Sequence, residues 1–155
     1  VLNYGLGNIQ AILNIYKNLN TPAFPISNVQ EFDRVNRIIL PGVGAFDWAM
    51  EKLNRSGLRD RLDELVIQKN IPVLGICVGM QMMAERSEEG QMDGLSWVQG
   101  DVKHFRHNIK LDNSAYIWKQ LFAKQNILTC YLIIRYRFTK NCVLIRLCYI
   151  LILFR

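Results

Sequence analysis

Five residues near the middle of the chain combine a nucleophile with the glycines that a sharp turn requires. Gly75-Ile76-Cys77-Val78-Gly79 has the pattern G-x-C-x-G, the thiol form of the strand–turn–helix arrangement called a nucleophile elbow. The glycines permit a tight turn and a close approach of neighbouring backbone. We therefore predict that Cys77 is a catalytic nucleophile at a helix N-terminus, where free N–H groups and the helix dipole favour a thiolate.

The residue after the cysteine adds a second expectation. The backbone N–H of Val78 would point to the place where an oxyanion forms when the thiolate attacks a carbonyl group. The alternative for a lone cysteine is a buried structural side chain. The two glycines, the apolar run before Cys77 and the helical pattern after it favour the nucleophile.

A second glycine-flanked loop, Pro41-Gly42-Val43-Gly44-Ala45-Phe46, follows another apolar run. Such a loop after a parallel strand can turn a backbone N–H toward the nucleophile. By itself, the Pro-Gly pair serves a plain β-to-α turn equally well. Beside Cys77 on a neighbouring strand, an oxyanion-hole role becomes the better interpretation.

Other motifs argue against cofactor chemistry. Gly5-x-Gly7 is followed by Gln10 where a third glycine is needed, so the dinucleotide fingerprint fails. We therefore reject a nicotinamide or flavin site, and the sequence has no Walker motif, no H-E-x-x-H and no clustered metal ligands. Met80, Met82 and Met83 suggest core packing rather than a soft-metal site. Ser87-Glu88-Glu89-Gly90 is either an acidic site or, preferably, a solvated helix end with a glycine C-cap.

These loops need strands and helices to position them, and apolar runs and helical spacing alternate along residues 1–109. We predict the end of a strand at Val1-Leu2 and a short strand bracketed by Pro22 and Pro25. Two further strands are predicted at Arg37–Leu40 and Pro72–Ile76. Apolar residues at helical spacing predict three helices. The first carries Ile9, Ile12, Leu13, Tyr16 and Leu19 on one face. The second carries Leu58, Leu62, Leu65 and Val66 and ends near Asn70, and the third follows Cys77. This alternation predicts a doubly wound parallel sheet with helices on both faces. Three loops, Tyr4–Asn8, Pro41–Phe46 and Gly75–Gly79, would meet at the carboxyl ends of its strands, where function resides in such sheets.

Composition divides the chain near residue 110. The 155 residues suffice for one domain with a core, and 50% hydrophobic with 21% charged residues excludes a disordered or wholly membrane-embedded chain. Residues 1–109 carry 11 Lys and Arg against 12 Asp and Glu, whereas residues 110–155 carry 8 against one acid. All ten Gly and all four Pro precede residue 110. The basic, apolar segment 110–155 has no nucleic-acid-binding motif, and its apolar run is too short and too charged for a membrane span.

Four ordered motifs together resemble a known family. Tyr4-Gly5-Leu6-Gly7-Asn8, Leu40–Phe46, Gly75–Gln81 and Ser87–Gly90 are similar to those of class I (triad) glutamine amidotransferases, in particular the glutaminase subunit of imidazole glycerol phosphate synthase. The resemblance covers about residues 1–109. It implies a flavodoxin-like α/β fold, incomplete at the C-terminus, in a cytoplasmic protein that uses no metal or organic cofactor. Separately, Val1-Leu2-Asn3-Tyr4 lacks a charged region followed by an apolar one, so we expect no signal peptide.

The resemblance also implies a reaction. Cys77 would attack the side-chain carboxamide of glutamine and pass through a thioester, releasing glutamate and ammonia. Gly42, Val43 and Gly44, with the amide of Val78, match the oxyanion and substrate loop, and Gln81 matches a residue that contacts glutamine. Asn8 matches the surface facing a (β/α)8-barrel cyclase, the expected heterodimer partner, which would use the ammonia to form imidazole glycerol phosphate in histidine biosynthesis. A paralogue supplying ammonia to surface-polysaccharide sugar modification fits the same motifs.

The chain departs from this family after residue 109. The family takes its general base and the orienting carboxylate from a His-Pro-Glu segment, but the last Pro here is Pro72 and no His follows His107. His104 and His107 do not match the catalytic position and are better interpreted as exposed strand-end residues. A reading-frame shift near residue 110 would explain the change, and sequencing the gene in all three frames would test it. We expect impaired catalysis, with a non-catalytic truncated module as the alternative.

Overall fold

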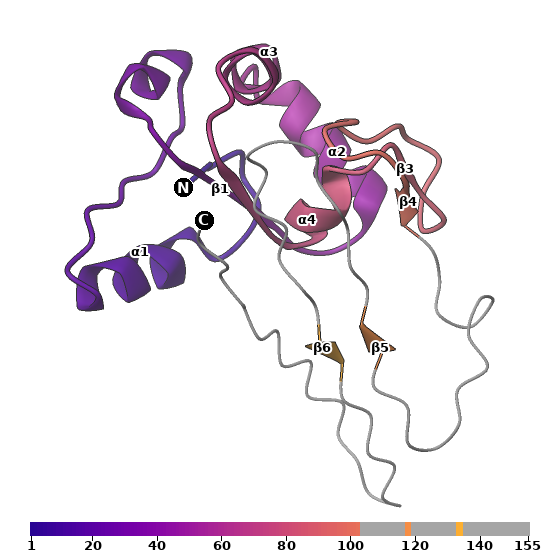
Figure 1. Cartoon of the computed structure of the whole chain (residues 1–155), viewed down its shortest axis with the longest axis horizontal. Helices are drawn as coiled ribbons and strands as arrows, with labels where there is room; N and C mark the ends of the chain where they lie inside the picture. The colour runs from indigo at the N-terminus through magenta and orange to yellow at the C-terminus, as the bar shows by residue number, and fades with distance from the viewer. Residues whose placement is uncertain (103–116, 119–132, 135–155) are drawn as a thin grey trace, which may run out of the picture.

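The computed structural model describes residues 1–102 and the backbone of residues 117–118 and 133–134. A parallel sheet lies at its centre (Figure 1). Strand β1 (Ile38–Gly42) pairs in parallel with β2 (Val73–Cys77), from Ile38 opposite Val73 to Gly42 opposite Cys77. Five consecutive buried residues in β1 explain why this segment forms a central strand, because both of its faces are covered.

The N-terminal segment extends this sheet on the other side of β1. The N–H of Leu2 donates to the carbonyl of Ile39 at 2.8 Å, and Leu2 forms a parallel bridge with Ile26. The order across the sheet is therefore the Ile26 segment, the Leu2 segment, β1 and β2. In chain order this is second, first, third and fourth, which is the flavodoxin-like arrangement. The predicted fold class is confirmed.

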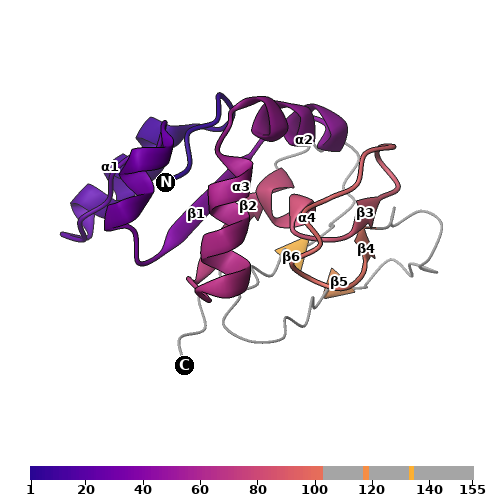
Figure 2. The ribbon, with the colours of Figure 1, turned by 90° about the horizontal axis from the view of Figure 1, so that it is seen from above.

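Helices cover both faces of the sheet (Figures 1 and 2). Helix α1 (Ile9–Asn18) packs its predicted apolar residues against Val1, Ile39 and Leu74 on one face. The opposite face carries the larger core, which includes Leu2, Ile38, Leu40 and Val73. Helices α2 (Phe46–Arg55), α3 (Arg59–Asp63) and α4 (Val78–Met82) lie on that face, and α3 continues into a π-helical turn, η2 (Glu64–Gln68).

Short elements complete the described part. A 3₁₀ helix, η1 (Val29–Arg34), begins with a capping box in which Asn28 and Glu31 exchange side-chain and backbone hydrogen bonds. Strand β3 (Arg86–Ser87) pairs in parallel with β4 (Asp101–Val102), and β5 (Ile117–Trp118) pairs antiparallel with β6 (Ile133–Ile134). Residues 103–116, 119–132 and 135–155 lie outside the described residues, so the predicted boundary near residue 110 remains a prediction.

Three local predictions need correction. The second strand pairs at Ile26, one residue beyond Pro25 rather than between the two prolines. Strand β1 continues through Pro41 and Gly42 instead of stopping before them. Leu19, predicted on the apolar face of the first helix, is the exposed C-cap residue of α1, because the helix ends at Asn18 before Leu19 can turn inward.

Helix α2 was missed although its signal is present in the sequence. Its four buried residues follow the spacing i, i+3, i+4, i+7, and all are completely buried: Phe46, Ala49, Met50 and Leu53. This is the pattern of an amphipathic helix. Because α2 begins directly after the second glycine-flanked loop, it sets the direction in which that loop leaves β1.

Candidate active site

Cys77 lies at the junction of β2 and α4, as the elbow pattern predicts. It is the last residue of β2, the N-cap of α4, and an exposed free cysteine. Its backbone has φ +55° and ψ −122°, a combination that residues with a side chain rarely adopt and that costs about 1–3 kcal/mol. This backbone conformation makes a sharp turn between β2 and α4, and Cys77 is exposed at the end of the strand.

Glycines allow the strand end and the start of α4 to lie against each other. A Cβ atom on Gly42 would lie 2.7 Å from the carbonyl carbon of Val78, and one on Gly75 would lie 2.5 Å from the Cα of Met80. Any side chain at these positions would push α4 away from the sheet. Gly42 is also the register partner of Cys77, so the second loop begins directly beside the candidate nucleophile.

In the second loop, the residues whose backbone amides were predicted to line an oxyanion hole are exposed. Val43 and Gly44 are exposed, whereas Gly42 is buried against α4. Gly44 has φ +88°, a left-handed conformation that glycine adopts without strain. The amides of residues 43 and 44 therefore belong to a short, conformationally permissive segment between a buried strand and helix α2. Val78, the other predicted contributor, is buried in the first turn of α4.

The first loop packs against the second. The buried hydroxyl of Tyr4 donates a hydrogen bond to the carbonyl of Pro41 at 2.6 Å, and a Cβ atom on Gly7 would lie 2.8 Å from the Cβ of Pro41. Burial raises the pKa of the Tyr4 phenol far above its usual value. All three predicted strand-end loops therefore meet at one end of the sheet.

The structure also describes the environment of two further predicted site residues, Asn8 and Gln81. The side-chain carbonyl of Asn8 is the N-cap acceptor of α1 and receives the N–H of Ala11 at 3.0 Å, and Asn8 is exposed. Gln81, on α4 one turn after Cys77, has a buried side-chain oxygen with no hydrogen-bond partner among the described residues. Since buried polar atoms are nearly always satisfied, this oxygen suits a ligand that would donate to it.

The acidic motif forms a turn rather than a helix end. Helix α4 ends at Met82, and Ser87 closes β3. The N–H of Gly90 donates to the carbonyl of Ser87, and the hydroxyl of Ser87 accepts from the N–H of Glu89. The preferred interpretation, a glycine C-cap of a helix, is therefore wrong, because β3 intervenes between the helix and the glycine.

Asp47 is a residue that sequence reasoning missed. It lies in the first turn of α2, and its carboxylate accepts hydrogen bonds at 2.9–3.0 Å from the N–H groups of Gln91 and Met92. Asp47 thereby ties the helix that follows the second loop to the segment that follows the acidic turn. An acidic residue in the first turn of an amphipathic pattern was the available signal.

Other candidates lie elsewhere or outside the described residues. His104, His107 and the segment 110–155 fall outside the described residues, apart from the backbone of β5 and β6. Within residues 1–102, Met82 and Met83 are buried in the core as predicted, whereas Met80 is only half-buried. No group of three or more potential metal ligands occurs among the residues that the structure describes. No helix in the described part is both long and apolar enough to span a bilayer.

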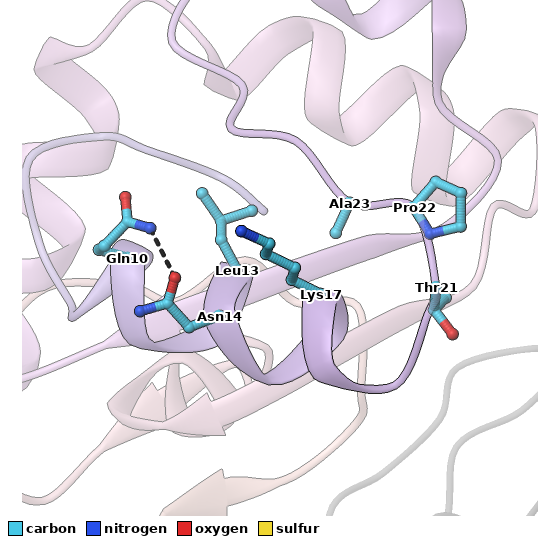
Figure 3. A pocket seen from close by; sticks show the side chains of 7 residues that line it. All are labelled: Gln10, Leu13, Asn14, Lys17, Thr21, Pro22 and Ala23. Atoms are coloured by element: carbon cyan, nitrogen blue, oxygen red, sulfur yellow. Dashed lines mark hydrogen bonds between the residues drawn. The ribbon is translucent and has the colours of Figure 1, made fainter.

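An open pocket of about 300 Å³ lies along α1 (Figure 3). Its lining residues are Gln10, Leu13, Asn14, Lys17, Thr21, Pro22 and Ala23. The Nε2 of Gln10 donates to the side-chain oxygen of Asn14 at 2.8 Å, so these two polar groups satisfy each other. None of the predicted site residues lines this pocket, and we assign it no part in the chemistry at Cys77.

Comparison with known proteins identifies the class to which this fold and site belong. A family model described as "Glutamine amidotransferase class-I" matches residues 2–141. The chain belongs to the class-I glutamine amidotransferase family. A solved structure described as "Crystal structure of glutamine amidotransferase" matches with a TM-score of 0.58 and 15% identity, covering 76% of this chain and 61% of that one, and supports the fold.

Curated relatives narrow the comparison. The imidazole glycerol phosphate synthase subunit HisH of Bdellovibrio bacteriovorus is 53% identical over 115 residues, 74% of this chain and 56% of that protein. HisH of Leptospira interrogans is 51% identical over 105 residues, 68% of this chain and 52% of its own length. HisH 2 of Methanococcus maripaludis is 33% identical over 139 residues, 89% and 69% of the two chains. The chain spans about half the length of the first two.

The matches differ in how far they extend beyond the four motifs. The family model continues to residue 141, beyond the predicted limit of the resemblance near residue 109. The two more similar relatives align over only 105 and 115 residues. The strongest similarity is therefore shorter than the family match.

Proposed function

We propose that this chain carries the nucleophile part of a glutaminase site. The Cys77 thiolate attacks the side-chain carboxamide carbon of glutamine, the carbon–nitrogen bond breaks, and ammonia leaves with an added proton. The resulting γ-glutamyl thioester is hydrolysed by water, which releases glutamate and restores the thiol. The observation that carries the proposal is the register pairing of Gly42 with Cys77, in a chain of the class-I amidotransferase family.

The oxyanion of the tetrahedral intermediate would be held by backbone amides. We assign this role to Val43 and Gly44, which with Gly42 form the segment hereafter called the oxyanion loop, and to the amide of Val78. Preorganised donors at the position where charge develops are worth about 10²–10³-fold in rate for each donor removed. The side-chain oxygen of Gln81, which has no hydrogen-bond partner within the described part of the chain, would accept a hydrogen bond from bound glutamine.

The ammonia would pass to a partner subunit. The curated relatives are named as subunits of imidazole glycerol phosphate synthase, which supports a partner subunit. We propose that this partner is a (β/α)8-barrel cyclase, that the two form a heterodimer, and that they act in histidine biosynthesis in the cytoplasm. The cyclase would complete a lyase reaction with the delivered ammonia. Asn8 is exposed at the start of α1, on a loop that packs against the Pro41 segment, and would face this partner.

No histidine that could act as a general base occurs among residues 1–102, the part of the chain described around Cys77. No His-Pro-Glu segment occurs in the 155 residues, and loss of a general base costs about 10²–10⁴-fold in rate. We therefore propose that the chain of these 155 residues turns over glutamine very weakly, even with a cyclase bound. The alternative is a non-catalytic module that docks the cyclase and hydrolyses no glutamine.

Ammonia release from glutamine, measured with and without the cyclase subunit, tests the proposal. We expect a rate about 10²–10⁴-fold below that of the Bdellovibrio HisH–cyclase pair, and no residual rate in the Cys77→Ala variant. A rate equal to that of the Bdellovibrio pair would refute the impairment. A residual rate that Cys77→Ala leaves unchanged would refute Cys77 as the nucleophile. Cyclase binding without any glutamine-dependent reaction at Cys77 would favour the docking module.

A further inference from the structure

The hydroxyl of Tyr4 makes a buried contact that the assigned reaction does not use. Tyr4 is only 5% exposed, and its hydroxyl donates to the carbonyl oxygen of Pro41 at 2.6 Å, across 37 positions of sequence. The same hydroxyl lies 3.5 Å from the sulfur of Met82. One polar group in the core therefore contacts the end of β1 and the helix that follows Cys77.

The acceptor of this hydrogen bond belongs to the peptide that starts the oxyanion loop. Rotating the Pro41–Gly42 peptide would turn the Pro41 carbonyl away from Tyr4 and leave two buried polar groups unpaired, which is costly. On its other side, Pro41 lies against Gly7, where an added Cβ would come within 2.8 Å of the Pro41 Cβ. The Tyr4–Asn8 loop therefore holds Pro41 by a hydrogen bond and by close packing.

The residues after Pro41 need such an anchor. Two of the three residues of the oxyanion loop are glycines, and Gly44 has φ +88°. Glycine backbone turns readily, and Val43 and Gly44 are exposed, so packing of their own atoms does little to fix the direction of their amides. Besides the pairing of β1 with β2, the hydrogen bond from Tyr4 holds the carbonyl of Pro41, the residue directly before the oxyanion loop.

We propose that Tyr4 is a positioning residue for the oxyanion loop: its hydroxyl fixes the Pro41–Gly42 peptide and thereby the direction of the Val43 and Gly44 amides. The inference rests on the proposed glutaminase function. Because Tyr4 would act through the oxyanion loop, loss of its hydroxyl should slow reactions that place a carbonyl oxygen in the oxyanion hole. Reactions of the Cys77 thiol that need no such oxygen should be spared.

The test compares two electrophiles at Cys77. 6-Diazo-5-oxo-L-norleucine places a ketone where glutamine has its carboxamide. A proton from water adds to the diazo carbon, the thiolate sulfur bonds to that carbon, and dinitrogen leaves with the electrons of the broken bond. Iodoacetamide alkylates the thiolate without an oxyanion hole. Both rates are measured at Cys77 by peptide mass spectrometry at pH 9, where cysteine thiols in general ionise and no separate base is needed. Because burial raises the pKa of Tyr4, its phenol stays a donor at this pH.

The variant Tyr4→Phe removes only the hydroxyl group. We expect the diazoketone rate to fall about tenfold or more and the iodoacetamide rate to stay within about twofold. Tyr16→Phe is the matched control, because Tyr16 is a half-buried tyrosine on α1, against the opposite face of the sheet; both of its rates should equal those of the parent chain. If Tyr4→Phe does not fold, judged by urea unfolding, 4-aminophenylalanine in place of Tyr4 is used instead. Its amino group sits at the ring position of the hydroxyl and can still donate to Pro41, so this variant should keep a diazoketone rate within about tenfold of the parent.

The outcomes separate the two claims. If Tyr4→Phe lowers both rates equally or neither rate, Tyr4 does not position the oxyanion loop, although the glutaminase proposal stands. If the chain with 4-aminophenylalanine at position 4 folds but loses diazoketone capture by much more than tenfold, a donor at this position is not what the loop needs and the inference fails. If the parent chain is alkylated by iodoacetamide but not by the diazoketone, the glutaminase proposal fails and the inference with it.

Discussion

Gly42 at the end of β1 lies directly against the backbone of Gly79 in the first turn of α4. A Cβ atom on Gly42 would overlap the nitrogen of Gly79, and a Cβ atom on Gly79 would overlap the carbonyl oxygen of Leu40. The two glycines thus set the distance between the strand that carries the oxyanion loop and the helix that follows Cys77. This contact explains why both glycine-flanked motifs occur in one chain.

Substitution of Gly79 tests that contact. Alanine is the better helix former, so Gly79→Ala would stabilise α4 if space were free. We expect the opposite, a loss of about 3 kcal/mol in the free energy of unfolding, because the methyl group displaces the Leu40 backbone. Gly57→Ala is the control, since its Cβ would meet nothing within 4 Å although its φ is +73°; it should cost about 1–2 kcal/mol. Equal losses in urea unfolding would contradict the close approach.

Asp47 provides a second test of how the site is supported. Asp47→Ala leaves the N–H groups of Gln91 and Met92 without their carboxylate acceptor. We expect a loss of about 1–3 kcal/mol in urea unfolding. Asp60→Ala is the matched control, because Asp60 also lies in the first turn of a helix but is exposed, and we expect it to cost less than about 1 kcal/mol. A loss no larger than the control's would show that the carboxylate does not hold this segment.

The core under α2 should respond to truncation. Leu53 on α2 is completely buried in the larger core cluster, and Leu53→Ala should cost about 2–5 kcal/mol through lost burial and the cavity left behind. Ile67 in η2 is 58% exposed, so Ile67→Ala should change stability by less than about 0.5 kcal/mol. Thermal or urea unfolding of both variants checks the pair, and similar losses would mean that the α2 core is not packed as described.

The capping box of η1 predicts a dependence of stability on pH. The backbone N–H of Ser27, followed by further groups that include the N–H of Asn28, lowers the pKa of Glu31 from its ordinary value. Because the pKa of Glu31 is lowered in the folded state, its ionised carboxylate stabilises the fold above about pH 4.3, the ordinary pKa of a glutamate in an unfolded chain. This stabilisation is lost as the pH falls through the pKa of Glu31 in the folded protein. Glu31→Gln should therefore flatten the loss of stability between about pH 5 and pH 3.

Urea midpoints of the parent chain and Glu31→Gln, measured at intervals from pH 6 to pH 3, give the comparison. The difference between the two chains should be largest near pH 6 and should shrink toward pH 3. A difference that stays constant over this range would show that the ionised carboxylate is not what stabilises the start of η1.

Local patterns predicted much of the fold. The spacing of apolar residues indicated α1 and the α3–η2 segment, and Asn70, where that helix was expected to end, has φ +53°. The G-x-C-x-G pattern indicated the turn at Cys77, because a strand–turn–helix junction is encoded by neighbouring residues. The helix α2 was encoded in the same way and was overlooked.

Contacts between distant residues were beyond such reasoning. Nothing near Tyr4 in the sequence shows that its hydroxyl meets Pro41, and nothing near Asp47 shows that it meets Gln91 and Met92. A close approach of backbone was predicted for the glycines beside Cys77, but nothing in the sequence shows that Gly79 meets Leu40 and Gly42. These pairings depend on the order of strands in the sheet, which periodicity alone does not determine.

Mapping the site of covalent capture by 6-diazo-5-oxo-L-norleucine in the intact chain tests the central claim most directly. The account predicts an adduct at Cys77 that excess glutamine prevents, and no adduct in Cys77→Ser. The other three cysteines of the chain, Cys130, Cys142 and Cys148, serve as internal controls for general thiol reactivity. Equal labelling of all four cysteines, or labelling of Cys77 that glutamine does not slow, would contradict a glutamine site at Cys77.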